Sequence, residues 1–294
     1  MPSPYAANLL QDKRILITGG GTGLGRGVAS HLAEHGAEVH LWGRRGGVLR
    51  EAAEEASGGR VHFQTVDVRD YDQVDAAMDA IWTGHGPLTG VVNNAAANFV
   101  ARTEELSPGG FAAISGTVMA GSFHTTLAAG KRWIAAGLPG SVVSTLATWV
   151  WTGSAYVVPS AMAKAAVHAM TMSLAVEWAH HGIRLNAVAP GPIPTDFAWE
   201  VLNPAGANAV GATQVEQIPA GRAGTVEELA NLTMFLLSDA CDYLTGQTIA
   251  MDGGQMLAGP ATFAGLTSLT DTDWAEIKDR ARSATAASKA QRSV

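Results

Sequence analysis

Residues 14–25 read RILITGGGTGLG, an apolar run followed at once by a turn that holds five glycines. A helical apolar pattern follows over Leu24–His35. Strand, glycine turn and helix in this order form the context of a dinucleotide-binding fingerprint. Gly19 would make the tight turn, Gly23 would let the backbone approach a pyrophosphate, and Gly25 would let the helix pack on the strand. The helix N-terminus would offer free N–H groups to the phosphates. The stretch therefore favours a cofactor cradle over a merely flexible loop.

The composition predicts a globular protein that binds neither nucleic acid nor membrane. The chain has 294 residues, of which 47% are hydrophobic, and a net charge of -7 without a long basic run. No apolar stretch reaches membrane-spanning length, and residues 1–12 lack the basic start and apolar core of a signal peptide. A single cysteine, Cys241, fits a reducing compartment and is expected to be a small buried hydrophobe. We therefore expect a cytoplasmic protein.

Apolar runs alternate with helical patterns along most of the chain, which predicts an α/β fold: a single Rossmann domain with a doubly wound parallel sheet flanked by helices. Strands are expected at 14–17, 39–42, 61–66, 90–92, 141–144, 184–188 and 246–251. Helices are expected at 24–35, 48–56, 71–82, 111–134, 159–181, 225–237 and 271–282. The expected organisation is a lead-in over 1–12, the Rossmann domain over 13–258, and a partly helical C-terminal extension over 259–294 with a frayed end.

The end of the second expected strand indicates which nicotinamide cofactor is preferred. Dinucleotide folds often place an acidic residue there, on the adenosine ribose hydroxyls. This chain has Arg44 and Arg45 instead. Two guanidinium groups can hold a 2′-phosphate, so we expect NADP(H) rather than NAD(H). The alternative is a pair of solvated surface arginines.

Six ordered motifs cover residues 11–255 and resemble the short-chain dehydrogenase/reductase family. They are the TGxxxGxG turn, Asp67-Val68, Asn93-Asn94-Ala95-Ala96, Lys164 within a long helix, Pro190-Gly191 and Asp252-Gly253-Gly254. Within the family the chain is most similar to the 2,4-dienoyl-CoA reductase branch. The segments that suggest this are residues 157–164, 190–193, 218–219 and 224–231.

The resemblance implies a set of cofactor contacts. Asp67 would meet the adenine, Asn93 would line the adenosine side, and Lys164 would bind the nicotinamide ribose. With the two arginines, the whole expected set is Thr18, Gly19, Gly21, Gly23, Leu24, Gly25, Arg44, Arg45, Asp67, Val68, Asn93, Ala95, Lys164, Pro190, Gly191, Ile193 and Thr195. The resemblance also implies a homo-oligomer, usually a tetramer.

The catalytic positions depart from the family pattern. Typical members have a Tyr four residues before the Lys, where this chain has Ser160, and a Ser thirteen residues earlier, at Ala147. The Asn of the preceding helix falls on Val118. The dienoyl-CoA branch also lacks the first Tyr. It uses a Tyr after the fifth strand and an Asn before a helix glycine, and these positions carry Trp149 and Ala120. Only Lys164 remains of the usual tetrad.

These departures fit enoyl-thioester chemistry better than carbonyl reduction. A serine hydroxyl is a poor acid for protonating an alkoxide, whereas an enolate needs hydrogen bonds and can take its proton from water. We therefore take Lys164, Tyr156 and Ser160 as the catalytic candidates. Ser160 shares a helix face with Lys164. The alternatives are a pocket-lining aromatic for Tyr156 and a helix N-cap for Ser160.

The expected substrate is small and apolar, such as a CoA or carrier thioester. Trp149 and Trp151 lie on the loop expected over the nicotinamide, with core packing as the alternative. The predicted pocket consists of Trp149, Trp151, Tyr156 and Phe197, the last of them in a Pro- and Gly-rich segment expected to be a lid or binding loop. No metal site is expected, because His124, His168, His180 and His181 have no companions at ligand spacing.

The sequence thus predicts an NADP(H)-dependent oxidoreductase that reduces an enoyl or dienoyl thioester or a related conjugated substrate. The missing Tyr, Ser and Asn leave two alternatives. One is a non-redox enzyme on the same fold, such as a cyclase, isomerase or dehydratase. The other is a catalytically inactive binding protein.

Overall fold

The computed structural model describes residues 4–56, 60–195, 217–259, 266 and 268–280. The predicted pocket residue Phe197 and most of its expected lid lie outside these residues. The described chain divides after Gly254 into two compact units. The second unit holds the short helix α10 (Gln255–Ala258) and a helix over residues 271–280, within the segment predicted to be helical. The candidate site residues belong to the first unit.

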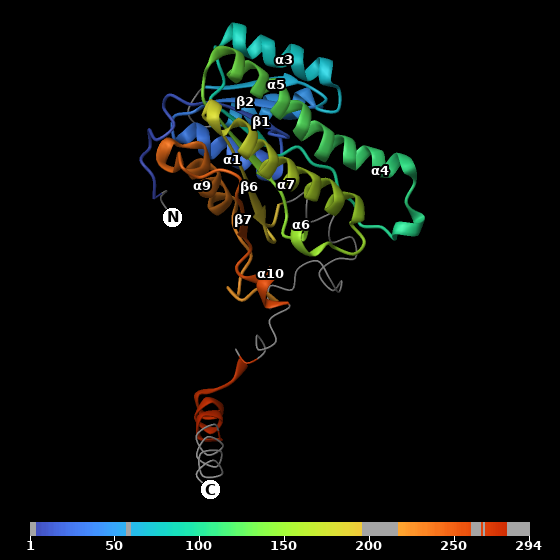
Figure 1. The fold of residues 1–294 in the computed structure, drawn as a ribbon, viewed down its shortest axis with the longest axis vertical. Helices are drawn as coiled ribbons and strands as arrows, with labels where there is room; N and C mark the ends of the chain where they lie inside the picture. Colours follow the sequence, from blue (N-terminus) through green and yellow to red (C-terminus); the bar gives the residue numbers. More distant parts are fainter. Residues whose placement is uncertain (1–3, 57–59, 196–216, 260–265, 267, 281–294) are drawn as a thin grey trace. The chain divides into compact units, whose positions relative to one another are not determined.

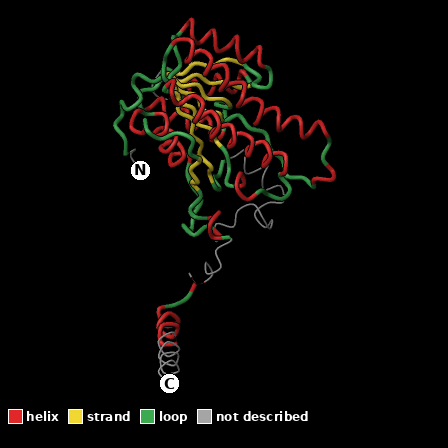
Figure 2. Tube along the Cα trace, in the orientation of Figure 1, coloured by secondary structure: helices red, strands yellow, loops and turns green. Residues whose placement is uncertain are grey.

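The first unit is built on a seven-stranded parallel sheet with the order β3-β2-β1-β4-β5-β6-β7. Figures 1 and 2 show this sheet with helices around it. The order reverses direction between β1 and β4, as expected for a doubly wound sheet. The strands are β1 (Arg14–Thr18), β2 (Glu38–Gly43), β3 (Val61–Thr65), β4 (Gly90–Asn93), β5 (Gly140–Thr145), β6 (Ile183–Pro190) and β7 (Thr248–Met251). This confirms the predicted fold class.

Helices cover both faces of the sheet (Figure 1). One apolar cluster joins the sheet to α1 (Gly23–Glu34), α2 (Gly46–Glu55) and α9 (Val226–Leu237). A second cluster joins the other face to α3 (Tyr71–Gly84), α5 (Gly121–Ala136) and α7 (Val158–Trp178). Successive residues of a strand pack into opposite apolar clusters, because their side chains point to opposite faces of the sheet. Both faces are therefore buried, as parallel sheets require.

The long helix predicted at 111–134 consists of three parts. They are α4 (Pro108–Ser115), the π-helical turn η2 (Gly116–Ala120) and α5. Trp149 and Trp151, expected on a loop, belong to the short helix α6 (Trp149–Thr152). The remaining short helices are η1 (Thr103–Glu105), η3 (Ala179–His181) and η5 (Asp239–Cys241).

Local signals fix several helix ends. The Thr225 side chain accepts from the Glu228 N–H and the Glu228 carboxylate accepts from the Thr225 N–H, which is the predicted capping box of α9. Gly182 ends the α7–η3 segment with φ 72°, a left-handed conformation that glycine adopts without strain. β6 begins at the next residue, Ile183.

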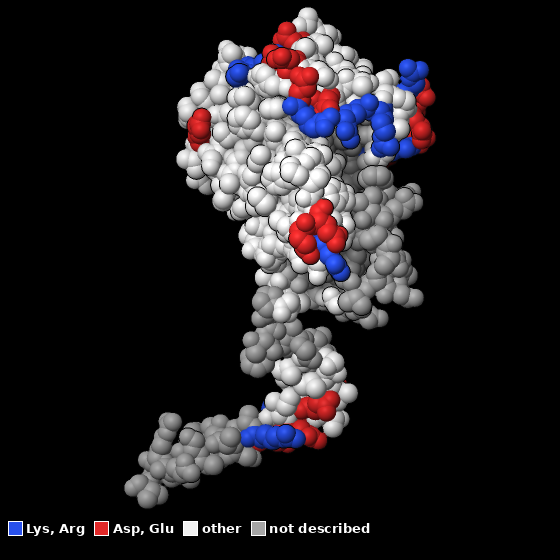
Figure 3. All heavy atoms as spheres, turned by 90° about the vertical axis from the view of Figure 1, so that its right-hand side faces the viewer, with Lys and Arg blue, Asp and Glu red and all other residues white. Residues whose placement is uncertain are grey.

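Figure 3 shows Lys and Arg side chains in a row across the upper part of the face that it draws, with Asp and Glu side chains next to them. Arg132 on α5 illustrates the pattern, since it pairs with Asp75 and Asp79 of α3. Within the described residues, every helix is too short or too polar to cross a membrane.

Candidate cofactor and substrate site

The glycine turn between β1 and α1 is closed by contacts that leave no room for side chains. Gly19 has φ 68°, and a Cβ added there would lie 2.9 Å from Ala95 Cα. A Cβ on Gly25 would lie 2.3 Å from the Gly19 carbonyl oxygen. Thr22 precedes α1 without making a side-chain cap bond. The first N–H groups of α1 therefore remain available to a ligand such as a phosphate.

The end of β4 is tied to this turn by Thr18. Its hydroxyl accepts the N–H groups of Asn94 and Ala95, both at 3.0 Å, and donates to the Val92 carbonyl at 3.4 Å. The Asn94 amide reaches the carbonyls of Thr18 and Gly19 at 3.2 and 3.3 Å. Asn94 therefore organises the turn, although the expected cofactor set omits it. Its place in the Asn93-Asn94 pair was the available sequence signal.

Leu24 and Gly21 support the turn from the α1–α2 side. Leu24 is partly buried against the first apolar cluster. A Cβ on Gly21 would lie 3.2 Å from Leu49 Cδ2, so α2 packs directly beneath the turn.

The arginines expected at the ribose phosphate follow the carboxyl end of β2. Arg44 and Arg45 are both exposed, and Arg45 is the N-cap residue of α2. Asp67 follows β3 and receives hydrogen bonds from the Arg69 Nε at 2.9 Å and the Arg69 N–H at 3.1 Å. The Arg69 hydrogen bonds, with a smaller contribution from the Arg44 charge, hold the pKa of Asp67 below its usual range. Arg44 and Asp67 thus lie at one edge of the crevice.

Val68 is buried and its side chain touches α5, where a Cβ on Gly121 would lie 2.5 Å from Val68 Cγ2. The Val68 carbonyl lies 3.0 Å from His124 Nδ1. His124 therefore has a structural partner.

Asn93, the last residue of β4, is buried at the centre of the sheet edge. Its amide nitrogen donates to Thr126 Oγ1 at 2.9 Å and to Ser144 Oγ at 3.4 Å. Its carbonyl oxygen is buried without a hydrogen-bond partner among the described residues. A buried acceptor of this kind normally has a partner, so a ligand or water is expected there.

The carboxyl end of β6 brings the last group of expected contacts to the same edge. Pro190 pairs in register with Met251 of β7, and Gly191 approaches Asp252 so closely that a Cβ would lie 2.7 Å from Asp252 Cβ. Ile193 is buried. Thr195 faces the glycine turn, since its Oγ1 would lie 3.5 Å from a Cβ on Gly23, which itself has φ 53°.

Lys164 lies in α7 beneath the carboxyl end of β5. It is 9% exposed, and its ammonium donates to the carbonyls of Thr145 and Leu146 at 3.0 and 2.9 Å. Burial lowers its pKa to about 8, from an ordinary 10.5. The charged form is retained at neutral pH, next to the crevice.

Ser160 lies one helical turn before Lys164 and is 1% exposed. Its hydroxyl has no hydrogen-bond partner among the described residues. The N-cap interpretation of Ser160 is wrong, because the helix begins at Val158 with Val157 as its N-cap. Ser160 lies inside the first turn of α7, where its hydroxyl is buried.

The other substituted tetrad positions are apolar. Val118 is buried in the π turn and packs against Ile114 and Ala163, and Ala147 is buried after β5. Neither side chain can exchange a proton. Both positions are part of the buried packing of the chain.

The aromatic residues expected around the substrate differ in how far they are exposed. The Trp149 indole nitrogen is buried and has no acceptor among the described residues. Trp151 is 42% exposed and its ring meets His168 edge-on at 5.9 Å. Tyr156 is 60% exposed and has φ 64°, a left-handed conformation that is costly for a residue with a side chain. α6 and α7 pack together, so Trp149 lies on the helix next to that of Ser160 and Lys164.

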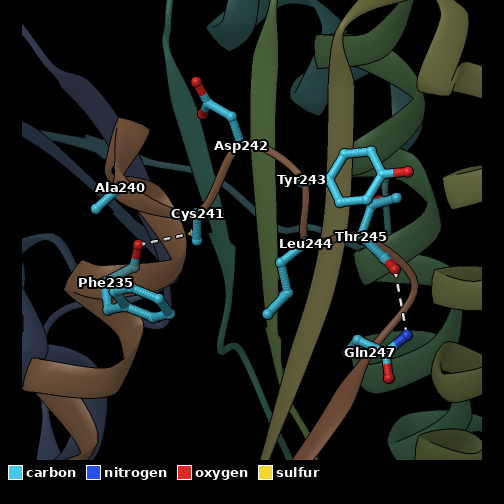
Figure 4. Close-up of a pocket in the computed structure, with 8 residues that line it drawn as sticks. All are labelled: Phe235, Ala240, Cys241, Asp242, Tyr243, Leu244, Thr245 and Gln247. Carbon is cyan, nitrogen blue, oxygen red and sulfur yellow. Dashed lines mark hydrogen bonds between the residues drawn. The ribbon is translucent and has the colours of Figure 1, made fainter.

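A separate hollow of about 590 Å³ lies at the opposite ends of the strands, between α9 and β7 (Figure 4). Its lining includes Cys241, whose thiol donates to the Phe235 carbonyl at 3.1 Å. Burial raises the pKa of this thiol. Cys241 therefore packs as a protonated, structural side chain.

The described residues fit a dinucleotide at the crevice. The glycine turn leaves a cradle that side chains would fill, the N-cap residue of α1 makes no side-chain bond, and the Asn93 oxygen and Ser160 hydroxyl are buried without partners in the part of the chain that the structure describes. Arg44, Asp67 and Lys164 border the same carboxyl edge of the sheet.

Comparison with known proteins supports this interpretation. The family model described as enoyl-(acyl carrier protein) reductase matches residues 19–256. The chain is 41% identical over 250 residues to a probable 2,4-dienoyl-CoA reductase 3 [(3E)-enoyl-CoA-producing] of Caenorhabditis elegans, covering 84% of this chain and 81% of the relative. It is 39% identical over 251 residues to a probable 2,4-dienoyl-CoA reductase [(2E)-enoyl-CoA-producing] of Bacillus subtilis (strain 168), covering 84% and 98%.

Among solved structures, a short chain dehydrogenase from Bacillus anthracis is similar with a TM-score of 0.75 and 38% identity, over 83% of this chain and 97% of the other. The six sequence motifs, the order of the strands in the sheet and the similarity to these relatives all indicate the same family. The chain therefore belongs to the short-chain dehydrogenase/reductase family, whose members are oxidoreductases with a nicotinamide cofactor.

Proposed function

We propose that this protein is an NADP(H)-dependent reductase of 2,4-dienoyl or related conjugated thioesters. The observation that carries the proposal is a pair of buried hydrogen-bonding groups that have no partner among the described residues, the Trp149 indole N–H on α6 and the Ser160 hydroxyl on α7, the helix that also carries the buried Lys164 ammonium. A hydrogen-bonding group buried without a partner is costly, so its retention favours a ligand partner.

The arrangement suits a substrate whose reduction generates an enolate. NADPH held at this crevice would supply the hydride that reduces the conjugated system. Negative charge then moves to the thioester oxygen, where fixed N–H and O–H donors stabilise it in a site with little water. Trp149 lies where the dienoyl-CoA branch has its tyrosine, and its indole N–H can donate the corresponding hydrogen bond, although it cannot release a proton at neutral pH.

The position of the final proton decides the product. When the hydride enters at C5 of a 2,4-dienoyl thioester, a proton at C2 leaves a 3-enoyl product and a proton at C4 leaves a 2-enoyl product. The two relatives described above are named for different products. Because this chain has no tyrosine at either family position, we expect water to deliver the proton, and product analysis to reveal which carbon receives it.

The test is a steady-state assay of nicotinamide oxidation with a panel of 2,4-dienoyl-CoA substrates. Trp149→Phe keeps the aromatic ring and removes the N–H, so we expect kcat to fall about 100-fold with a smaller change in KM. Trp82→Phe on α3 is the matched control and should retain kcat. Full activity of Trp149→Phe, or no turnover of any dienoyl-CoA by the wild type, would refute the proposal.

The preference for NADP(H) is tested separately by titration. We expect Arg44→Ala to weaken NADPH binding about 10- to 100-fold, since a charge-assisted hydrogen bond to the 2′-phosphate is lost, and to leave NADH binding nearly unchanged. Arg50→Ala, an exposed arginine of α2 that contacts Phe63, is the control. Equal losses for both cofactors would contradict the assignment.

The buried apolar side chains of Val118 and Ala147 favour one alternative, a non-redox enzyme that uses the same pocket. Substrate turnover without any change in nicotinamide absorbance would support it. Homotetramer formation and a cytoplasmic location stay predictions, which sedimentation and cell fractionation test.

A further inference from the structure

Four side chains capable of binding a metal ion converge on the edge of the sheet opposite the cofactor crevice. They are Glu38 and His40 of β2, His62 of β3, and His85, the C-cap residue of α3. Glu38 is the first residue of β2, whereas Arg44 and Arg45 follow its last residue. The cluster is therefore about one strand length away from the proposed chemistry, and the proposed function does not use it.

The convergence follows from the fold and not from local sequence. Glu38 and His40 are two apart on one strand and share a face. The parallel register places His62 directly beside His40, with ring centroids 5.0 Å apart. His85 arrives from the end of α3, which covers this face, with its ring 4.7 Å from that of His40 and 4.2 Å from that of His62.

The donor atoms surround a single carboxylate oxygen. Glu38 Oε1 lies 3.0 Å from His85 Nδ1, 3.3 Å from His40 Nε2 and 3.6 Å from His62 Nε2. The ligand atoms of Glu38, His40 and His85 all lie within 4.8 Å of one another. A tetrahedral zinc site with metal–ligand bonds of 2.0–2.1 Å has ligand–ligand separations of about 3.3 Å. The distances from Glu38 Oε1 are close to this separation; Glu38, His40 and His85 form the compact group, and His62 is the more distant fourth donor.

The Glu38 carboxylate also contacts Arg14 of β1. Arg14 Nη2 lies 3.3 Å from Glu38 Oε2, and Arg14 Nε lies 3.3 Å from Glu38 Oε1, the oxygen nearest the histidines. The guanidinium therefore contacts both carboxylate oxygens and can fix the orientation of the carboxylate.

Access is provided by a surface pocket of about 450 Å³ that His40, His62 and His85 line together. The side chains of His62 and His85 are 41% and 35% exposed, whereas that of His40 is 3% exposed. An ion can enter past the two outer histidines and reach the buried one. Three imidazoles and a carboxylate favour borderline ions such as Zn²⁺ over the oxygen-seeking Mg²⁺ and Ca²⁺.

We propose that Glu38, His40 and His85 bind a divalent transition ion of the Zn²⁺ type, with His62 as the fourth ligand. All four ligands are protein groups, and a site with no open position is structural. The ion would link the edge strand β3, the strand β2 and the end of α3, and would stabilise that edge of the sheet. The competing explanation is a metal-free hub in which imidazole N–H groups and Arg14 donate to Glu38.

The test uses the untagged, full-length chain after chelator treatment, with Co²⁺ as the spectroscopic probe and Zn²⁺ as the calorimetric one. We expect one equivalent of Co²⁺ to give the intense visible absorption of a four-coordinate ion, and Zn²⁺ to displace it and raise the melting temperature. His85→Gln and His62→Gln change partly exposed side chains, so both variants should still fold. Each should abolish the four-coordinate spectrum and weaken Zn²⁺ binding at least about 100-fold. This magnitude is expected because the loss of a ligand should weaken binding more than the loss of an outer-shell partner.

His180→Gln is the matched control, because His180 and His181 form another pair of neighbouring imidazoles, with centroids 3.8 Å apart, at the exposed end of α7. It should bind Co²⁺ and Zn²⁺ like the wild type. A wild-type spectrum of six-coordinate Co²⁺ only, or a four-coordinate spectrum that survives in both His85→Gln and His62→Gln, would overturn the proposal and leave the metal-free hub. None of these measurements depends on turnover, so failure here is distinguishable from failure of the proposed reductase activity.

Discussion

The substitution Lys164→Met tests two effects of the buried ammonium. One is its effect on the free energy of unfolding, and the other is its contribution to turnover. In the folded chain the pKa of Lys164 is about 8, against 10.5 for an ordinary lysine, because burial disfavours the ammonium. The gap corresponds to about 3 kcal/mol of free energy. Between these two pH values the unfolded chain holds one proton more than the folded chain. The free energy of unfolding of the wild type must therefore rise with pH across this window.

The assay is urea unfolding of the wild type and Lys164→Met from pH 7 to 10.5, expressed as the difference between the two proteins so that other titrating groups cancel. Below pH 8 both states of the wild type are protonated and the difference should be constant. From pH 8 upward the wild type should gain on the variant by about 1.4 kcal/mol per pH unit, up to about 3 kcal/mol in all.

Turnover should follow the opposite trend. If the ammonium serves the substrate or cofactor, kcat/KM of the wild type falls as the pH rises through about 8, and Lys164→Met is inactive at every pH. Lys278→Met, at an exposed position of the second unit, is the control and should keep the turnover of the wild type. Parallel unfolding profiles for the wild type and Lys164→Met between pH 8 and 10.5 would refute the argument that Lys164 is buried as a destabilised cation.

Three further substitutions test local features. Gly25→Ala would place a methyl group 2.3 Å from the Gly19 oxygen, so we expect a lower melting temperature and at least 10-fold weaker binding (about 1.4 kcal/mol) of NADPH by fluorescence titration; unchanged binding would contradict the cradle. Tyr156→Gly relieves a left-handed tyrosine at φ 64° and should stabilise the chain by about 1 kcal/mol in urea, while retained turnover would exclude the Tyr156 hydroxyl from catalysis. Thr225→Ala removes the cap on α9 and should cost about 1 kcal/mol, whereas a neutral result in the same assay would show that Glu228 alone suffices.

The fold was predictable because its signals are local or nearly so. The run Arg14–Thr18 with the glycines behind it specifies a strand, a turn and a helix within some twenty residues, and the alternation of such units leaves few topologies. Thr225 and Glu228, three residues apart, fix a helix start in the same way. The expected cofactor positions gather at one edge for the same reason, since the carboxyl ends of parallel strands all point to it.

The features of the two candidate sites that the sequence did not predict depend on contacts between residues that are far apart in the chain. The sequence is compatible with Ser160 as an N-cap, but the helix begins two residues earlier, at Val158, which buries the hydroxyl inside the first turn. The Trp149 indole N–H has no acceptor among the described residues, a property that depends on the positions of residues distant in sequence. The histidines of the proposed metal site cannot be recognised in the sequence for a related reason. His40, His62 and His85 are about twenty residues apart, and only the β2–β3 register and the end of α3 bring them together.

The π turn Gly116–Ala120 has a consequence for how this chain tolerates changes in length. α4 packs on α7 before the turn, and α5 packs on α3 after it. A π turn carries one more residue than an α turn, so it rotates the following helix by about 100° relative to the preceding one. Deleting a single residue there, such as Met119, would regularise the helix and turn the apolar face of α5 away from α3. Substitutions at this joint are therefore accepted more readily than insertions or deletions, and the spacing between α4 and α5 should be preserved even where the residues around Val118 diverge.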